Sequence, residues 1–97
     1  LHPAKGKADV IAVTNEFMGD FTMKFTLKSD LGELAQLPVS VFLDNIHKMT
    51  VSVQGTNGKW VEESRILNMG FGHNHYIKFY YGADNLEIKE IVLTPNR

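Results

Sequence analysis

The chain has 97 residues, a formal charge of −1 and no cysteine, and its apolar and charged fractions are 43% and 22%. This is the composition of one ordinary folded domain, which excludes an intrinsically disordered chain. Scattered Lys and Arg without a net positive charge exclude the electrostatic footprint of a nucleic-acid partner. No apolar run approaches the roughly 20 residues that span a bilayer, so we predict no membrane insertion. The missing thiols exclude disulfides, thiolate zinc sites and cysteine nucleophiles.

Apolar residues recur with a period of two along most of the chain, as in strands that bury one face. In segment 21–28 the apolar face holds Phe21, Met23, Phe25 and Leu27. The same alternation predicts strands at 10–14, 39–44, 48–54, 61–67, 76–81 and 86–94. Turn residues rich in Gly, Asn and Asp separate these segments. We therefore predict an all-β fold, an antiparallel β-sandwich of the jelly-roll kind.

The organisation is that of a single β-sandwich domain over residues 1–97, with residues 1–8 as a flexible lead-in. Gly32 and Pro38 predict that residues 30–38 form a long loop rather than a helical turn. Three aromatic residues fall opposite the core face of their strands, at Phe42, Tyr76 and Tyr80. We expect them to pack beneath that loop, and the alternative is an exposed aromatic platform.

Trp60 is the only tryptophan, and it follows the hydrophilic loop 55–59 rather than an apolar run. An indole held at a loop edge offers a flat face for the C–H groups of a sugar ring. Asn85 heads the last predicted strand, and its amide both donates and accepts, as a vicinal diol requires. In the alternative interpretation, Trp60 caps the core and Asn85 is only a turn residue.

The sequence offers weak signals for metal binding and for catalysis. His73 and His75 have an i, i+2 spacing that suits zinc, but no third ligand of obvious spacing accompanies them. The carboxylates at 62, 63, 87 and 90 alternate with basic residues, as cross-strand ion pairs do. No carboxylate pair is framed by a cleft, and no nucleophile elbow or phosphate loop occurs. We predict no metal site, no catalytic residue and no enzyme activity, and keep a zinc hydrolase only as a third hypothesis.

Five segments, in order, resemble strands of carbohydrate-binding modules of the family-six and family-thirty-five type. They are Gly19–Leu27, Val39–Asn45, Gly58–Trp60, Gly72–Phe79 and Asn85–Leu93. The resemblance implies a galactose-binding-like jelly roll carried by a secreted polysaccharide-acting enzyme or a surface protein. It also implies that Trp60 stacks on a terminal sugar and Asn85 hydrogen-bonds it, with Asn57 in the Trp loop as a third candidate.

The N-terminal part departs from that family, whose modules usually begin with a Glu-bearing strand and loops that provide a calcium site. Nothing before Asp9 supplies these features, so calcium is implied by the resemblance alone. We expect a strand or more to be missing there. The open edge would then pair with the missing segment or with a second copy of the chain, giving a homodimer.

The preferred hypothesis is a non-catalytic, secreted or cell-surface module that recognises a poly- or oligosaccharide by aromatic stacking and amide hydrogen bonds. The alternative is a structural or protein-interaction β-sandwich, an accessory domain of a larger secreted protein. The solvent exposure of the indole at Trp60 distinguishes the two, because the alternative places this ring in the core.

Overall fold

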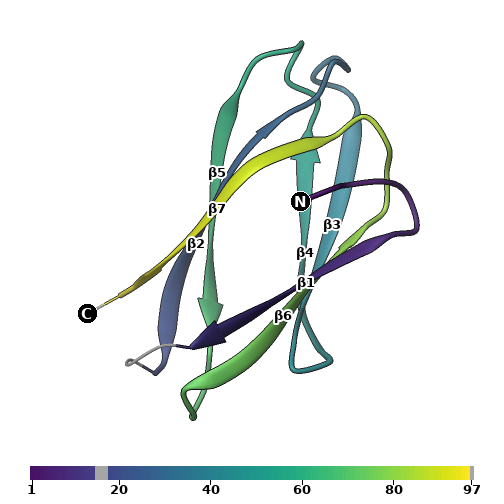
Figure 1. Cartoon of the computed structure of the whole chain (residues 1–97). Helices are drawn as coiled ribbons and strands as arrows, with labels where there is room; N and C mark the ends of the chain where they lie inside the picture. The colour runs from purple at the N-terminus through teal and green to yellow at the C-terminus, as the bar shows by residue number, and fades with distance from the viewer. Residues whose placement is uncertain (15–17, 97) are drawn as a thin grey trace.

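The fold was obtained as a computed structural model, which describes residues 1–14 and 18–96. Its strands are β1 (Ala8–Thr14), β2 (Asp20–Lys28), β3 (Gln36–Leu43), β4 (Ile46–Gln54), β5 (Val61–Asn68), β6 (Asn74–Tyr81) and β7 (Glu87–Pro95). They form two antiparallel sheets that face each other, in the orders β1-β6-β3-β4 and β5-β2-β7 (Figure 1). The predicted all-β sandwich is confirmed, and the described residues contain no helix that could cross a membrane.

The core lies between the two sheets and follows the alternation of the sequence. On β2, the four apolar side chains are at most 3% exposed, whereas the Thr and Lys side chains between them face outward. On β6, Ile77, Phe79 and Tyr81 are fully buried in the same way. The ring of Phe79 packs edge-on against Phe25 of the opposite sheet, with centroids 5.8 Å apart. The period-two pattern therefore identified the core faces of these strands.

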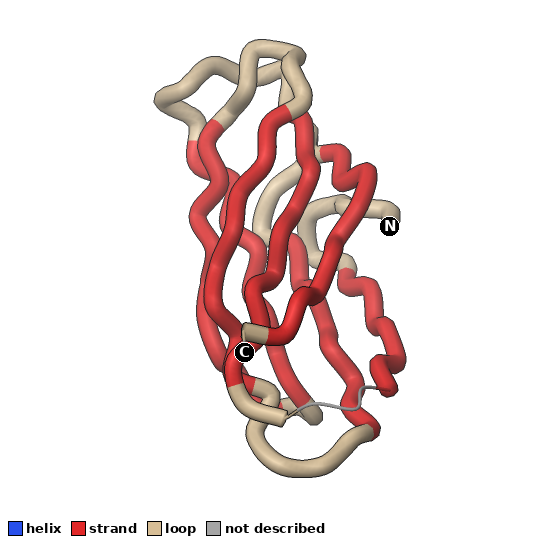
Figure 2. The backbone as a smooth tube through the Cα atoms, turned by 90° about the vertical axis from the view of Figure 1, so that its left-hand side faces the viewer, coloured by secondary structure: helices blue, strands red, loops and turns tan. Residues whose placement is uncertain are grey.

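Only β3 and β4 are joined as neighbours in one sheet. Their two-residue turn, Asp44 and Asn45, has φ angles of 50° and 67°, which Asp and Asn tolerate in tight hairpin turns. All other consecutive strands lie in different sheets. The connecting loops consequently gather at the two ends of the sandwich (Figure 2).

The prediction that residues 30–38 form a loop is wrong at its C-terminal end. β3 begins at Gln36, buries Leu37 and includes Pro38, which pairs with Ser52 of β4. β6 pairs with β3 only from Val39 onward, so the missing N–H of Pro38 falls where β6 has ended. There the N–H of Gly82 donates to the Pro38 carbonyl, and a Cβ at Gly82 would lie 2.7 Å from the proline ring.

The outward-facing aromatic residues are also not covered as predicted. Tyr76 and Tyr80 are 64% and 43% exposed on the outer face of the four-stranded sheet. Phe42 is half-buried, and the ammonium group of Lys78 lies 4.5 Å from its ring centroid. Tyr76 and Tyr80 therefore form an exposed aromatic surface on this sheet.

The segment before β1 is held by backbone hydrogen bonds. Gly6 N donates to the Tyr81 carbonyl, and Tyr81 N donates to the carbonyl of Lys7. His2 N donates to the carboxylate of Asp9, which also accepts from the buried Tyr81 hydroxyl at 2.7 Å. Flexibility of residues 1–8 stays a prediction, and Ala8 is already part of β1.

Candidate functional site

Trp60 lies immediately before β5, at the edge of the three-stranded sheet. Val61 pairs with Leu27 of β2, so the preceding indole falls beside Lys28 on the outer face of that sheet. The side chain is 45% exposed, which places it at the surface and not in the core. It lines an open hollow of about 490 Å³, here called the indole hollow, whose other residues are Leu1–Ala4 and Leu86–Lys89.

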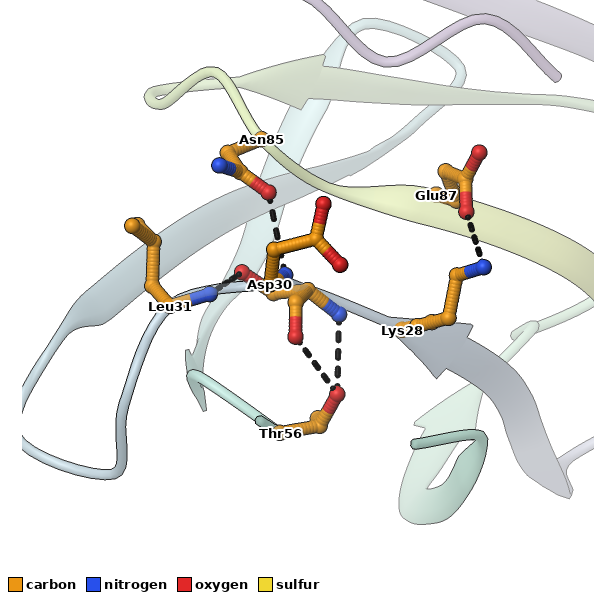
Figure 3. Close-up of polar contacts among 7 residues, drawn as sticks. Lys28, Asp30, Leu31, Thr56, Asn85 and Glu87 are labelled. Carbon is orange, nitrogen blue, oxygen red and sulfur yellow. Dashed lines mark hydrogen bonds and ion pairs between the residues drawn. The ribbon is translucent and has the colours of Figure 1, made fainter. Parts of the chain in front are cut away.

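Two lysines hold the indole ring in place. The Nζ atom of Lys28 lies 4.9 Å from the ring centroid, and that of Lys89 lies 5.6 Å from it. Contacts of this kind contribute about 0.5–1 kcal/mol each at exposed sites. Lys28 also forms an ion pair with Glu87 at 3.0 Å (Figure 3). The two ammonium groups therefore lie over the ring and cover part of it, and the Glu87 carboxylate is paired with one of them.

Asn85 lies next to this site, in the turn before β7. Its φ of 61° is the left-handed conformation that Asn adopts readily, and its Oδ1 accepts from the Asp30 N–H at 3.0 Å (Figure 3). The Nδ2 group points away from Asp30 and has no hydrogen-bond partner among the described residues. Asn85 thus serves the turn through its oxygen and still presents a donor to solvent.

The hollow lined by Asn85 adjoins the indole hollow. It has a volume of about 210 Å³, and it shares Leu86 and Glu87 with the indole hollow. Lys28 also lines it, with its ammonium beside the Trp60 ring. The structure therefore brings two of the three predicted binding residues to adjoining parts of one surface.

Asn57 does not join them. Its backbone N–H donates to the carbonyl of Leu31, and its φ of 54° marks it as a turn residue. The hollows that it lines, of about 450 and 280 Å³, include neither Trp60 nor Asn85. A role for Asn57 in binding stays a prediction, without support from its position.

The loop that carries Asp30 is fixed to the loop after β4. The Thr56 hydroxyl accepts from the Ser29 N–H and donates to the Ser29 carbonyl, both at 2.9 Å (Figure 3). The Ser29 hydroxyl accepts from the Leu31 N–H at 3.2 Å. Because Asn85 bonds to Asp30, these contacts hold the amide in a defined position in the hollow that it lines.

Sequence reasoning missed the contribution of three charged residues, Lys28, Glu87 and Lys89. Alternation correctly placed Lys28 on an outward face, and Glu87 and Lys89 were interpreted as members of surface ion pairs. What brings them to the indole is the order β5-β2-β7. Alternation within single strands carries no information on which strands are neighbours, so this grouping had no signal in the sequence.

His75 has a structural position in the fold. It is 7% exposed, and its Nδ1 lies 2.6 Å from the Asp44 carboxylate. Its Nε2 lies 3.2 Å from the carbonyl of Gly72, while the second oxygen of Asp44 accepts from the Tyr76 N–H at 2.9 Å. The ring thus ties the β3–β4 turn to the turn before β6. No group of three or more His, Cys, Asp or Glu side chains that could hold a metal ion occurs in the described ranges 1–14 and 18–96.

The Asp44 contacts predict an acid-sensitive contribution to stability. Hydrogen bonds from His75 and from the Tyr76 N–H lower the pKa of the Asp44 carboxyl below its ordinary value. Such a group stabilises the fold above its unfolded pKa of about 4, and this contribution is lost as the pH falls through the lower folded pKa. We expect the thermal midpoint of the wild type to exceed that of Asp44→Asn at pH 6, with the gap closing as the pH approaches about 2.

Thermal unfolding of both proteins at closely spaced pH values measures this gap. Asn at position 44 retains an acceptor for the Tyr76 N–H and tolerates the φ of 50°, and it places an uncharged NH₂ group where the second carboxylate oxygen faces His75. A gap that stays constant from pH 6 to strongly acidic solution would show that the carboxylate contributes nothing as an ion.

Comparisons with known proteins identify the fold. No protein-family model matches the sequence, and no curated protein matches it. A family 35 carbohydrate-binding module from an environmental isolate superposes with a TM-score of 0.80 at 13% identity, covering 96% of this chain and 69% of that chain. A family GH115 4-O-methyl-α-glucuronidase with specificity for decorated arabinogalactans gives 0.80 at 12% identity, covering 96% and 14%. The sugar-binding C-terminal domain of EclA gives 0.59 at 16% identity, covering 97% and 81%.

These similarities show that the chain has the fold of carbohydrate-binding modules, as the sequence resemblance implied. Two of the three neighbours are small sugar-binding domains, and the third is a large enzyme of which this fold occupies a small part. The unit that this chain reproduces is therefore a binding-module fold and not a catalytic one.

Proposed function

We propose that this protein is a non-catalytic carbohydrate-binding module that holds a sugar ring against Trp60. The observation that carries the proposal is the 45% exposure of the only tryptophan, in a hollow that adjoins Asn85. A core indole, which the alternative interpretation requires, would be sealed between the sheets. The similarity in fold to sugar-binding domains supports the same function.

The chemistry of the site suits a pyranose better than a reaction. The part of the indole that the lysines leave uncovered takes the C–H groups of the sugar. Lys28 and Lys89, whose ammonium groups lie over the ring, and the Asn85 Nδ2 group offer donors to the hydroxyls. One stacked ring with a few hydrogen bonds gives on the order of −4 to −6 kcal/mol, a millimolar to tens-of-micromolar dissociation constant. We propose that the ligand bound with this affinity is a poly- or oligosaccharide.

The setting of the module is part of the proposal. We infer that it is secreted or displayed at the cell surface and serves as a lectin-like accessory domain of a polysaccharide-acting protein. Calcium stays a prediction from the family resemblance, and dialysis against a chelator followed by thermal unfolding and sugar titration tests it. A lowered midpoint or lost binding after chelation, restored by calcium, would establish the ion.

A glycan array followed by fluorescence titration tests the function. Trp60 is the sole tryptophan, so its emission reports on this site alone. We expect a half-exposed emission maximum and a saturable change on adding the oligosaccharide that the array selects, with neutral and anionic sugars tested at matched ionic strength. An array without ligands, or a bound sugar that leaves the indole emission unchanged, contradicts the proposal.

The Asn85 amide should contribute a smaller share of the binding. Asn85→Gly accepts the φ of 61° but removes both the Nδ2 donor and the Oδ1 acceptor of the Asp30 N–H. We expect roughly fivefold weaker sugar binding from loss of the donor, equivalent to one hydrogen bond of about 1 kcal/mol. Asn85→Ala should in addition destabilise the fold by roughly 1–2 kcal/mol, because alanine disfavours the left-handed conformation. Sugar titration and thermal unfolding of the pair separate the two roles. Unchanged affinity in the glycine variant would remove Asn85 from the site.

A further inference from the structure

Four strands lie at sheet edges, and three of them carry features that prevent pairing with another chain. β1 and β4 bound one sheet, and β5 and β7 bound the other. In β4, Lys48 is the extra residue of a bulge, because Val41 pairs with Met49 and Phe42 with His47. Bulges and charged residues, above all Lys, are the usual protections of a sheet edge.

β7 and β5 are protected by the same devices. In β7, Lys89 is the extra residue of a bulge, because Thr26 pairs with Glu90 and Leu27 with Ile88. β5 has no bulge in its pairing with β2, but it carries charged side chains at Glu62, Glu63 and Arg65. These three edges are therefore poor templates for a further strand.

β1 has no bulge and no outward-facing charged residue. Its sequence, from Ala8 to Thr14, contains no Lys, Arg, Pro or Gly, and its pairing with β6 has no shift in register. Its single charged residue, Asp9, is half-buried and accepts from the Tyr81 hydroxyl inside the sandwich. Val10 is 60% exposed on the outer face. Within the described residues, β1 pairs with β6 alone. Its other edge therefore has unpaired backbone groups and mostly apolar side chains, and it can pair with a further strand.

We propose that β1 pairs antiparallel with β1 of a second copy of this chain, about a two-fold axis at Ile11. This register sets Ala8 opposite Thr14 and Asp9 opposite Val13, and Val10 opposite Ala12. No like charges face each other, so the strand is complementary to itself. The two four-stranded sheets join into one continuous sheet of eight strands, and the interface is isologous.

The outer face of the same sheet supplies apolar contacts for this pairing. Ala12 lies opposite Tyr76 of β6, and Tyr76 is 64% exposed. In the dimer, Val10 of each copy faces Ala12 of the other and approaches the Tyr76 beyond it. Pairing therefore covers two of the most exposed apolar side chains of the sheet and also satisfies the backbone groups of its free edge.

Mass measurement of the 97-residue chain by light scattering after size exclusion, at increasing concentration, tests the dimer. We expect a shift from the 10.9 kDa monomer toward twice that mass. Val10→Lys combined with Ala12→Lys sets two ammonium groups opposite each other and should restore the monomer at every concentration. Ile66→Lys, an equally exposed apolar position on β5, is the control and should remain dimeric. A monomeric wild type, or a double variant that still dimerises, overturns the proposal.

Engineered thiols test the register, since the chain has no cysteine of its own. Directly opposed Cα atoms of antiparallel strands lie about 4.5–5.5 Å apart, within disulfide reach, so Ile11→Cys should cross-link in a mild oxidant. Val13→Cys, on the same face and similarly half-buried, would lie roughly 13 Å from its symmetry mate and should not. Equal cross-linking of the two variants, or none, contradicts the two-fold axis at Ile11. These readouts involve no sugar and are independent of the proposed function.

Discussion

Trp60→Ala should weaken sugar binding roughly 60-fold while the protein stays folded. A sugar stacked on the indole covers roughly 100 Å² of its apolar surface. At about 25 cal/mol per Å², the lost contact is worth about 2.5 kcal/mol, or roughly 60-fold in the dissociation constant. A dissociation constant of tens of micromolar would then rise to about the millimolar range, and a millimolar one would fall below detection by titration calorimetry or affinity electrophoresis. The fold should survive, because the ring is 45% exposed and its neighbours include the ammonium groups of Lys28 and Lys89.

Two further variants make this result specific. Tyr76→Ala removes an aromatic side chain that is 64% exposed on the other sheet, so sugar binding should not change. Trp60→Phe keeps a smaller aromatic face and should retain part of the affinity. If Trp60→Ala binds the selected glycan as tightly as the wild type, the stacking site lies elsewhere. The exposed Tyr76 and Tyr80 rings would then be the first alternative to examine.

The sequence correctly predicted those features of the fold that depend on the residues of one strand alone. The alternation in β2 identified each buried residue from Phe21 to Leu27, and the Asp44 and Asn45 pair identified the hairpin turn. The prediction of a loop at Pro38 failed because the free-energy cost of a proline in a strand depends on the neighbouring strand. Proline is tolerated in β3 because β6 ends beside it, so no hydrogen bond is lost. The prediction for Tyr76 and Tyr80 failed for a similar reason. The alternation correctly placed both side chains on the outer face, but it held no information on whether the loop at 30–38 covers them.

The candidate site was predictable only in part, for the same physical reason. The hydrophilic loop before Trp60 correctly indicated an indole at the surface, and Asn85 lies in a turn ahead of the last strand. Whether these two residues share a surface depends on β2 lying between β5 and β7, which is a long-range property. The same long-range order brings Lys28 and Lys89 to the ring and leaves Asn57 apart from it.

Phe79→Ala should be the most destabilising single change among those considered. Phe79 is completely buried on β6, and its ring meets Phe25 of β2 at an interplanar angle of 83°, joining the two sheets. Truncating a buried phenylalanine costs about 3–5 kcal/mol through lost burial and the cavity left behind. The total stability of such a domain is about 5–15 kcal/mol. We therefore expect a thermal midpoint roughly 15–30 °C lower, measured by circular dichroism.

The adjacent residue provides the matched control for this prediction. Tyr80 follows Phe79 on the same strand but faces outward and is 43% exposed, so Tyr80→Ala should cost less than about 1 kcal/mol. Comparable losses of stability at the two positions would show that the alternation of β6 does not separate core from surface.

A double-mutant cycle of Phe25→Ala with Phe79→Ala isolates the contact between the two sheets. The two rings touch, so the combined loss should fall short of the sum of the single losses. Full additivity would mean that each ring stabilises only its own sheet, and the two layers would then be held together by the aliphatic residues around them.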